Sequence, residues 1–204
     1  MDEFLLDDLE FKIDLPELFR AIRMDETDDD AETVIKMARE AEAIARPRAL
    51  YRVSYIDEKG DDYVVIDGVK FVSHVMSVNL KDAHRVFPYV ATCGVELENW
   101  SNSIDDFLEQ YWADAIKIQA LQHAVRSMDI HLENHVKMRK TASMNPGSLE
   151  DWPISEQEKL FRVLGDVKEK TVVLLTDSFL MLPVKSVSGI MFPTESNYEN
   201  CKLC

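Results

Sequence analysis

The stretch from Leu175 to Gly189 reads LTDSFLMLPVKSVSG and places two apolar runs on either side of a proline. Residues 172–175 and 187–192 are rich in β-branched and large apolar residues, so each run predicts a strand. Met181-Leu182-Pro183 breaks the chain between them, because proline donates no backbone hydrogen bond. This order departs from a regular βαβ rhythm, in which a helix separates successive strands.

Elements upstream of this stretch follow the same irregular order. Further strands are predicted at residues 50–56, 63–66, 69–72 and 86–93, with an Asp67-Gly68 hairpin turn. Helices are predicted from Leu15, and from a start at residues 27–30 to an end at Pro47. Further helices are predicted from Val95, from a start at 103–106, over about 111–140, and from Pro153 to Gly165 with a capping box at residues 155–158. We therefore expect an α+β fold, a mostly antiparallel twisted sheet flanked by helices, in a single domain over residues 1–204.

Charge is distributed unevenly along the 204 residues. The net charge is −15, and residues 1–30 hold 12 acids and 3 bases. So negative a chain is poorly suited to bind a phosphate backbone, which argues against a nucleic-acid partner. The acid-rich stretch is read as a solvated face, with a docking surface for a basic partner as the alternative. The acidic N-terminus is no secretory signal and no apolar run is long enough to span a membrane, so we expect a cytoplasmic protein without a membrane partner.

Three cysteines are too few for a disulfide framework. Cys93 follows a predicted strand and is read as a buried thiol. Cys201 and Cys204 form a C-x-x-C pair, which is half of the four-thiolate set that usually holds a metal or an iron–sulfur cluster. The pair is an incomplete metal site unless the natural chain extends further. His131 and His135 stand at i, i+4, but without the H-E-x-x-H order or an obvious third ligand they favour a polar helix face.

Common catalytic signatures are missing from the chain. The sequence contains neither a dinucleotide-binding G-x-G-x-x-G after a strand, nor a phosphate-binding P-loop, nor a G-x-S-x-G nucleophile elbow. Two stretches stand out instead: residues 144–153, with Pro146-Gly147 at their centre, and residues 175–189. Small residues and proline let a backbone approach a ligand closely and present its polar groups, although two tight connections around a sheet would have the same composition.

These two stretches resemble the activation domain of cobalamin-dependent methionine synthase, and more closely its free-standing, corrinoid-associated relatives. That family has a Pro-Gly loop followed by a Pro-led helix, then a Leu-Thr-Glu-Ser-Phe-x-Met-x-Pro segment and a Ser-Val-Ser-Gly strand. Here they correspond to Pro146-Gly147, the helix from Pro153, residues 175–183 with Asp177 for Glu, and residues 186–189. The likeness is strong over about 144–198 and weaker over about 86–140, which makes 86–204 an activation-domain-like region preceded by N-terminal helices and a hairpin in 1–85.

The resemblance implies a function in methionine biosynthesis. An activation domain binds S-adenosylmethionine and holds its methyl group over the cobalt of an oxidised, inactive cobalamin. The methyl group and an electron from a reductant then restore methylcobalamin. A free-standing member would act on cobalamin carried by a partner methyltransferase or another corrinoid protein, with an electron-donor protein as a further partner. Its own contribution would be positioning, because the reactive centres belong to the cofactors.

The resemblance also implies which residues bind the cofactor. The loop residues Asn145, Pro146, Gly147 and Ser148 would contact S-adenosylmethionine, and Trp152 would offer an aromatic face to its sulfonium, with core packing as the alternative. Two more candidates are Tyr198, for a late family tyrosine, and Asp129, for an acidic ligand on the long helix. The family has an Arg where this chain has Ser143, and a Tyr where it has Ser148.

Three functions therefore remain open. The first is a reactivation factor that binds S-adenosylmethionine. The second is a non-catalytic module that binds a corrinoid protein and has lost S-adenosylmethionine, as the replaced Arg and Tyr would suggest. The third is an electron-transfer accessory whose iron–sulfur site includes Cys201 and Cys204 and needs ligands beyond the present chain.

Overall fold

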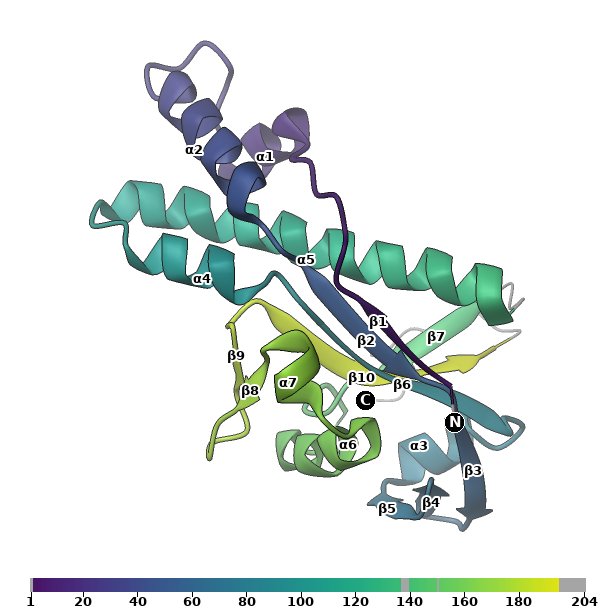
Figure 1. Cartoon of the computed structure of the whole chain (residues 1–204). Helices are drawn as coiled ribbons and strands as arrows, with labels where there is room; N and C mark the ends of the chain where they lie inside the picture. The colour runs from purple at the N-terminus through teal and green to yellow at the C-terminus, as the bar shows by residue number, and fades with distance from the viewer. Residues whose placement is uncertain (1, 137–139, 150, 195–204) are drawn as a thin grey trace.

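The centre of the fold is strand β6 (Arg85–Thr92), which lies in an eight-stranded sheet. A computed structural model describes residues 2–136, 140–149 and 151–194. One edge of β6 pairs with β10 (Ser186–Pro193), and the other pairs with β2 (Arg48–Arg52) and then with β3 (Ser54–Lys59). All these pairs are antiparallel, which confirms the predicted α+β class with a mostly antiparallel sheet (Figure 1).

The remaining strands extend the sheet on both sides. Strand β1 (Glu3–Leu6) pairs with β2, and β7 (Thr141–Met144) pairs with β10 at the opposite edge. Strands β4 (Tyr63–Ile66) and β5 (Val69–Val72) continue from β3 as antiparallel hairpins. The β4–β5 turn places Asp67 and Gly68 at positive φ, as the predicted Asp-Gly hairpin requires.

One face of the sheet is covered by the long helix α5 (Phe107–Val136). Every second side chain of these strands points to this face. Among them, Tyr51, Tyr89 and Met191 pack against Met128 and Leu132 of the helix. The C-terminal end of α5 lies beside β7 (Figure 1). No helix in the described part of the chain is both long enough and apolar enough to cross a membrane.

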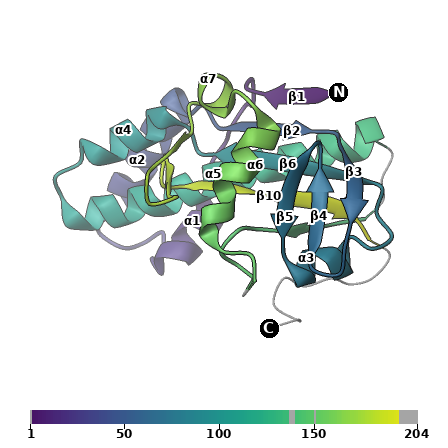
Figure 2. The ribbon, with the colours of Figure 1, turned by 90° about the horizontal axis from the view of Figure 1, so that it is seen from below.

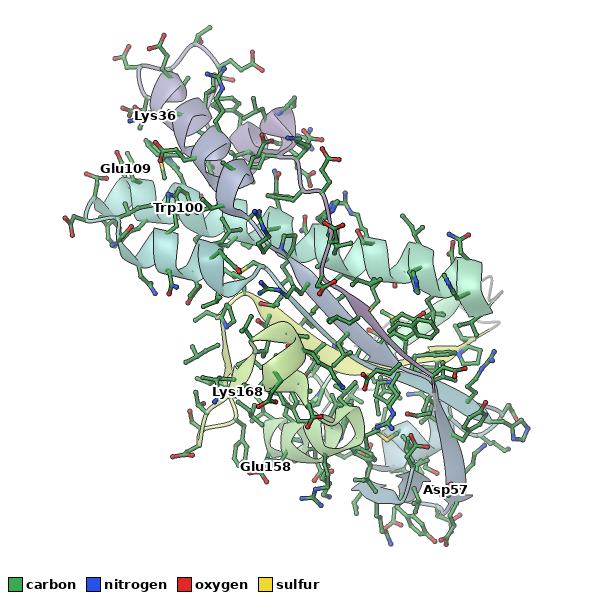
Figure 3. The ribbon with its side chains drawn as sticks, in the orientation of Figure 1. Lys36, Asp57, Trp100, Glu109, Glu158 and Lys168 are labelled. Atoms are coloured by element: carbon green, nitrogen blue, oxygen red, sulfur yellow. The ribbon has the colours of Figure 1, made fainter. Side chains whose placement is uncertain are left out.

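The opposite face carries α3 (His74–Asn79), α6 (Gln157–Leu164) and α7 (Val167–Thr171). Figure 2 shows α6 and α7 on the side of the sheet opposite α5. The strand side chains that point to this face, such as Val90 and Ile190, share a core with Leu160. The exposed Glu158 and Lys168 lie on the outer side of these helices (Figure 3). The sheet is therefore buried on both faces along β6.

A third core lies beyond the end of the sheet. Helices α1 (Leu15–Ile22), α2 (Ala31–Ile44) and α4 (Val95–Asn102) pack around the first half of α5, and Cys93 is buried among them. Helix α1 starts as predicted, with Asp14 accepting a hydrogen bond from the Glu17 amide at 2.9 Å. The acid-rich residues 25–30 between α1 and α2 are exposed, in agreement with a solvated stretch.

Several elements differ from the sequence prediction. The strand predicted at 50–56 is two strands separated at Val53, and β7 occupies residues predicted as a helix end and a loop. Val172 has φ 58° and ends α7, so the next strand, β8 (Leu174–Leu175), is shorter than predicted. A 3₁₀ turn, η1 (Ile154–Glu156), precedes α6. No side chain forms a capping hydrogen bond at the first residues of η1 or of α6, so the predicted capping box is wrong. These segments are too short for their periodicity to identify them.

Candidate functional site

The Pro-Gly loop follows directly from the edge strand β7. Its turn is closed by backbone hydrogen bonds, from the Gly147 amide to the Trp152 carbonyl at 2.8 Å and from the Ser148 amide to the Asn145 carbonyl at 3.1 Å. The amides of Gly147 and Ser148 are thus used inside the turn. The carbonyl oxygens of Pro146 and Gly147 accept no hydrogen bond from the residues that the structure describes. The turn therefore presents these two carbonyl oxygens as acceptors, while its Gly147 and Ser148 amides are already used.

Gly147 has the backbone conformation that favours glycine. Its φ is +83°, and an added Cβ would lie 3.3 Å from the Cβ of Ile154. Side chains other than glycine adopt this region at a cost of roughly 1–2 kcal/mol. Gly147 and Ser148 are both exposed, so the turn presents its backbone at the surface.

Asn145 joins the loop to the sheet. Its side-chain nitrogen Nδ2 donates to the Tyr89 hydroxyl at 2.9 Å and to the Ser188 carbonyl oxygen at 2.8 Å. A backbone carbonyl can only accept, so the contact with Ser188 decides that the amide nitrogen faces β10. The loop thus starts from a carboxamide held by two different strands.

Gly189 allows the Tyr89 side chain to reach that carboxamide. Gly189 of β10 is directly opposite Tyr89 of β6 in the strand register. An added Cβ would lie 3.0 Å from the Tyr89 ring, 2.6 Å from Nδ2 of Asn145 and 2.5 Å from the Met144 carbonyl oxygen. The phenol therefore crosses β10 over a residue without a side chain. A side chain at position 189 would collide with both Tyr89 and Asn145, so their hydrogen bond requires glycine there.

Asp129 of α5 lies close enough to this group for its charge to act on Tyr89. Burial raises the pKa of the half-buried Asp129 carboxyl, and the negative charge of Glu133 raises it further. Burial is also the main cause that raises the pKa of Tyr89; hydrogen bonds from Ser143 and Asn145 oppose that rise, while the charge of Asp129 adds to it. The charge of the predicted acid on the long helix thus acts on the tyrosine that bonds to the Asn145 side chain.

Trp152, at the other end of the loop, points into the core. Its side chain is fully buried and meets Phe71 edge to face, with ring centroids 6.3 Å apart. The neighbouring Asp151 accepts hydrogen bonds from the Ser73 hydroxyl at 2.9 Å and the Val75 amide at 3.0 Å, which attaches the loop to α3. Core packing, the alternative given above for Trp152, accounts for this position.

The second motif stretch forms a small hairpin and then β10. Strand β8 pairs with β9 (Met181–Leu182), and the turn between them includes Phe179. Buried Gln157 donates to the Phe179 carbonyl at 2.8 Å and accepts from the Ser188 hydroxyl at 2.9 Å. Since the Ser188 carbonyl also accepts from Asn145, the two motif stretches are connected through Ser188.

Other predicted site residues contribute no metal centre to the described structure. Tyr198, Cys201 and Cys204 lie outside the described residues. The His131 imidazole forms a hydrogen bond with the Tyr51 hydroxyl at 2.8 Å, and its ring stacks on that of His135 at 3.9 Å between centroids. Among the described residues, no group of three or more His, Cys, Asp and Glu side chains could hold a metal ion.

Three residues of this network were not identified from the sequence: Tyr89, Gln157 and Ser188. Ser188 lies in the family motif at residues 186–189, and Tyr89 carries a signal of its own, because it puts a phenol hydroxyl into a strand that is mostly apolar and buried. A buried hydroxyl requires a partner, so such a residue indicates a contact across the sheet. Its partner, 56 residues away in the chain, could not be read from that signal.

Comparison with known proteins agrees with this arrangement. Residues 145–202 match the protein-family model described as vitamin B12 dependent methionine synthase, activation domain. No curated protein matches the chain. A crystal structure of the MetH reactivation domain bound to AdoHcy has a similar fold, with a TM-score of 0.71 at 15% sequence identity, over 98% of this chain and 81% of that chain. The resemblance to the activation domain is thereby confirmed, and the matched segment begins at Asn145.

Proposed function

We propose that this protein binds S-adenosylmethionine at the loop after β7 and supports the reductive methylation of cobalamin on a partner methyltransferase. The observation that carries the proposal is the position of Asn145. It begins the segment that matches the activation-domain family, and its side chain anchors the exposed Gly147 turn to Tyr89 and Ser188. The similar MetH reactivation domain was crystallised with AdoHcy, the demethylated form of the same cofactor.

The polar groups near this loop fit a cationic ligand that is rich in hydrogen-bond donors. The turn presents the carbonyl oxygens of Pro146 and Gly147, and Asp129 supplies a carboxylate nearby. S-adenosylmethionine carries a positive sulfonium and an ammonium group, both of which such acceptors favour. Phosphorylated nucleotides would instead meet a turn whose Gly147 and Ser148 amides are already used, on a chain with a net charge of −15.

The protein would act by positioning the cofactor. S-adenosylmethionine supplies a methyl group on a positively charged sulfur, and the transfer to reduced cobalt leaves a neutral thioether. The rigid turn at Gly147 would hold the cofactor at the surface, where a partner can reach it, and Asp129 would orient its cationic part. Holding two reactants in a productive geometry can supply a large share of a rate enhancement.

A second candidate is a corrinoid-protein binding module that no longer binds S-adenosylmethionine. It is favoured by Ser143 and Ser148, which replace the Arg and the Tyr of the family motif. The Ser143 side chain lies close enough to Tyr89 to lower the pKa of that phenol, and Ser148 is exposed. Neither position supplies a cation or an aromatic ring, so any cofactor affinity would have to come from the other residues of the site.

Titration calorimetry of the purified protein tests the first candidate directly. We expect S-adenosylmethionine and S-adenosylhomocysteine to bind with Kd values of about 10–100 μM, equivalent to about 5–7 kcal/mol of binding free energy. Saturating ligand should also raise Tm. If neither compound gives heat or a shift in Tm at millimolar concentration, the first candidate fails.

Methyl transfer separates the two candidates further. The probe is a cobalamin-binding fragment of a methionine synthase in the Co(II) state, mixed with titanium(III) citrate as the one-electron reductant and S-adenosylmethionine. Formation of methylcobalamin and S-adenosylhomocysteine only when this protein is present supports the reactivation role. Binding of the fragment without methyl transfer and without cofactor affinity supports the second candidate.

A further inference from the structure

The Tyr89 hydroxyl is a buried polar group at the junction of three elements. Tyr89 lies on β6 with 3% of its surface exposed, beneath α5. Its oxygen accepts a hydrogen bond from the Asn145 amide nitrogen at 2.9 Å, and Ser143 of β7 lies close enough to lower the pKa of Tyr89. One hydroxyl of the central strand therefore bonds to the first residue of the loop that follows the edge strand.

These contacts extend into the turn itself. The Asn145 carboxamide is held at its nitrogen by Tyr89 and by the Ser188 carbonyl. The Asn145 backbone carbonyl accepts the Ser148 amide at 3.1 Å, the bond that closes the first part of the turn. A change at the Tyr89 hydroxyl can thus reach the exposed turn through Asn145.

Tyr51 provides an internal comparison. It pairs with Tyr89 in the register of β2 and β6, on the same face of the sheet, and it is 1% exposed. Its hydroxyl bonds to His131 of α5 at 2.8 Å and forms no hydrogen bond with the described residues of the loop. Two buried tyrosines thus share a layer and a face, but Tyr89 alone of the pair bonds to the segment that matches the family.

We propose that Tyr89 is a positioning residue of the cofactor site, whose hydroxyl holds Asn145, and through it the turn at 145–149, in the geometry that binds S-adenosyl compounds. The proposal rests on the function proposed above and adds a residue outside the matched segment. Removing the hydroxyl leaves the aromatic ring to fill the core. Of the two hydrogen bonds that the Asn145 amide nitrogen donates to Tyr89 and Ser188, only the bond to Ser188 then remains.

The test compares Tyr89→Phe with Tyr51→Phe in calorimetric titrations with S-adenosylhomocysteine. We expect Kd to rise about tenfold for Tyr89→Phe, and to change less than about twofold for Tyr51→Phe, although each variant loses one buried hydroxyl. Circular dichroism of both variants should remain that of the original protein. An unchanged Kd in Tyr89→Phe overturns the proposal.

A double-mutant cycle with Asn145→Ala distinguishes positioning from a general effect on packing. If Tyr89 acts through Asn145, Tyr89→Phe should change Kd less than about twofold in the Asn145→Ala background. A second tenfold loss in that background would mean that the hydroxyl acts by another route, and the proposal would be wrong.

Hydrogen exchange separates this proposal from the proposed function, because it needs no ligand. Tyr89→Phe should speed the exchange of the amides in residues 147–149 several-fold, while Tyr51→Phe should leave them unchanged. Unchanged exchange in Tyr89→Phe overturns the positioning role even if the protein binds the cofactor. Faster exchange in a protein that binds no S-adenosyl compound overturns the proposed function and the ligand part of this proposal together.

Discussion

The two faces of the sheet at β6, β10 and β7 are occupied very differently. On the face toward α6, Met144, Val90 and Ile190 join a closed apolar core with Trp152. On the face toward α5, the same three strands bring Ser143, Tyr89 and Gly189 together beside Asp129. The neighbouring residues Ser143 and Met144 of one strand therefore lie on opposite faces, Ser143 in the polar group and Met144 in the apolar core.

This difference shows how an edge strand can serve a core and a site at once. Successive side chains of a strand point to opposite faces, so β7 can bury Met144 and still direct Ser143 to the polar group. The core face also holds polar side chains, such as Ser188, whose hydroxyl donates to Gln157, whereas the buried Trp152 Nε1 has no hydrogen-bond partner among the described residues. The loop at Asn145 is thus anchored on a face that packs tightly, and its exposed turn is kept in place.

Trp152→Ala tests the core face and should have the largest effect. The indole is fully buried, so its loss should lower the free energy of unfolding by about 3–5 kcal/mol, as measured by urea denaturation. The folded variant should bind S-adenosylhomocysteine as the original protein does. Trp100→Ala, at a half-buried position of α4, is the control and should cost less. A stable Trp152→Ala variant with lost ligand affinity would place the indole in the cofactor site instead.

Gly147→Val tests the exposed turn and should affect ligand binding more than stability. A valine at φ +83° and in contact with Ile154 should displace the turn, cost about 1–2 kcal/mol of unfolding free energy and weaken S-adenosylmethionine binding at least tenfold. Gly68→Val is a matched control, because Gly68 has φ +77° with nothing within 4 Å of an added Cβ. It should lose similar stability and keep its Kd. Equal loss of affinity in both variants would remove the loop from the site.

Asp129→Asn tests the polar face and should have the smallest effect on stability. Since folding raises the pKa of this carboxyl, the folded state binds protons more readily than the unfolded state, and stability falls as pH rises through that pKa. The amide should therefore stabilise the protein at pH 7, and this gain should disappear below the pKa of the unfolded carboxyl, near pH 3. Thermal unfolding at both pH values measures this.

The same variant should bind S-adenosylmethionine more weakly at pH 7, because the cation loses a carboxylate. Asp177→Asn, at an exposed position of the β8–β9 turn, is the control and should change unfolding by less than about 0.5 kcal/mol. An Asp129→Asn protein with weaker stability at pH 7 and full cofactor affinity would contradict both parts of this prediction.

Much of the fold could be predicted because its signals are local. The Asp67-Gly68 turn, the helix start at Leu15 and the apolar runs of β6 and β10 each depend on signals within a few residues of the chain. Strand β7 could not be predicted, because Thr141–Met144 shows no clear alternation and becomes a strand only by pairing with β10. Of the site, the Asn145–Ser148 turn and Asp129 came from the family resemblance, whereas Tyr89, Gln157 and Ser188 required the strand register.

By itself the sequence determined the class of fold, the motif around Pro146-Gly147 and the likeness to the activation domain, because composition, turn residues and motifs are properties of neighbouring residues. The tertiary structure alone decided that Trp152 belongs to the core and that Tyr89 contacts Asn145 across Gly189. These contacts depend on the order β6–β10–β7 and on its register. A shift of one residue in that register would exchange the two faces, and no local pattern specifies it.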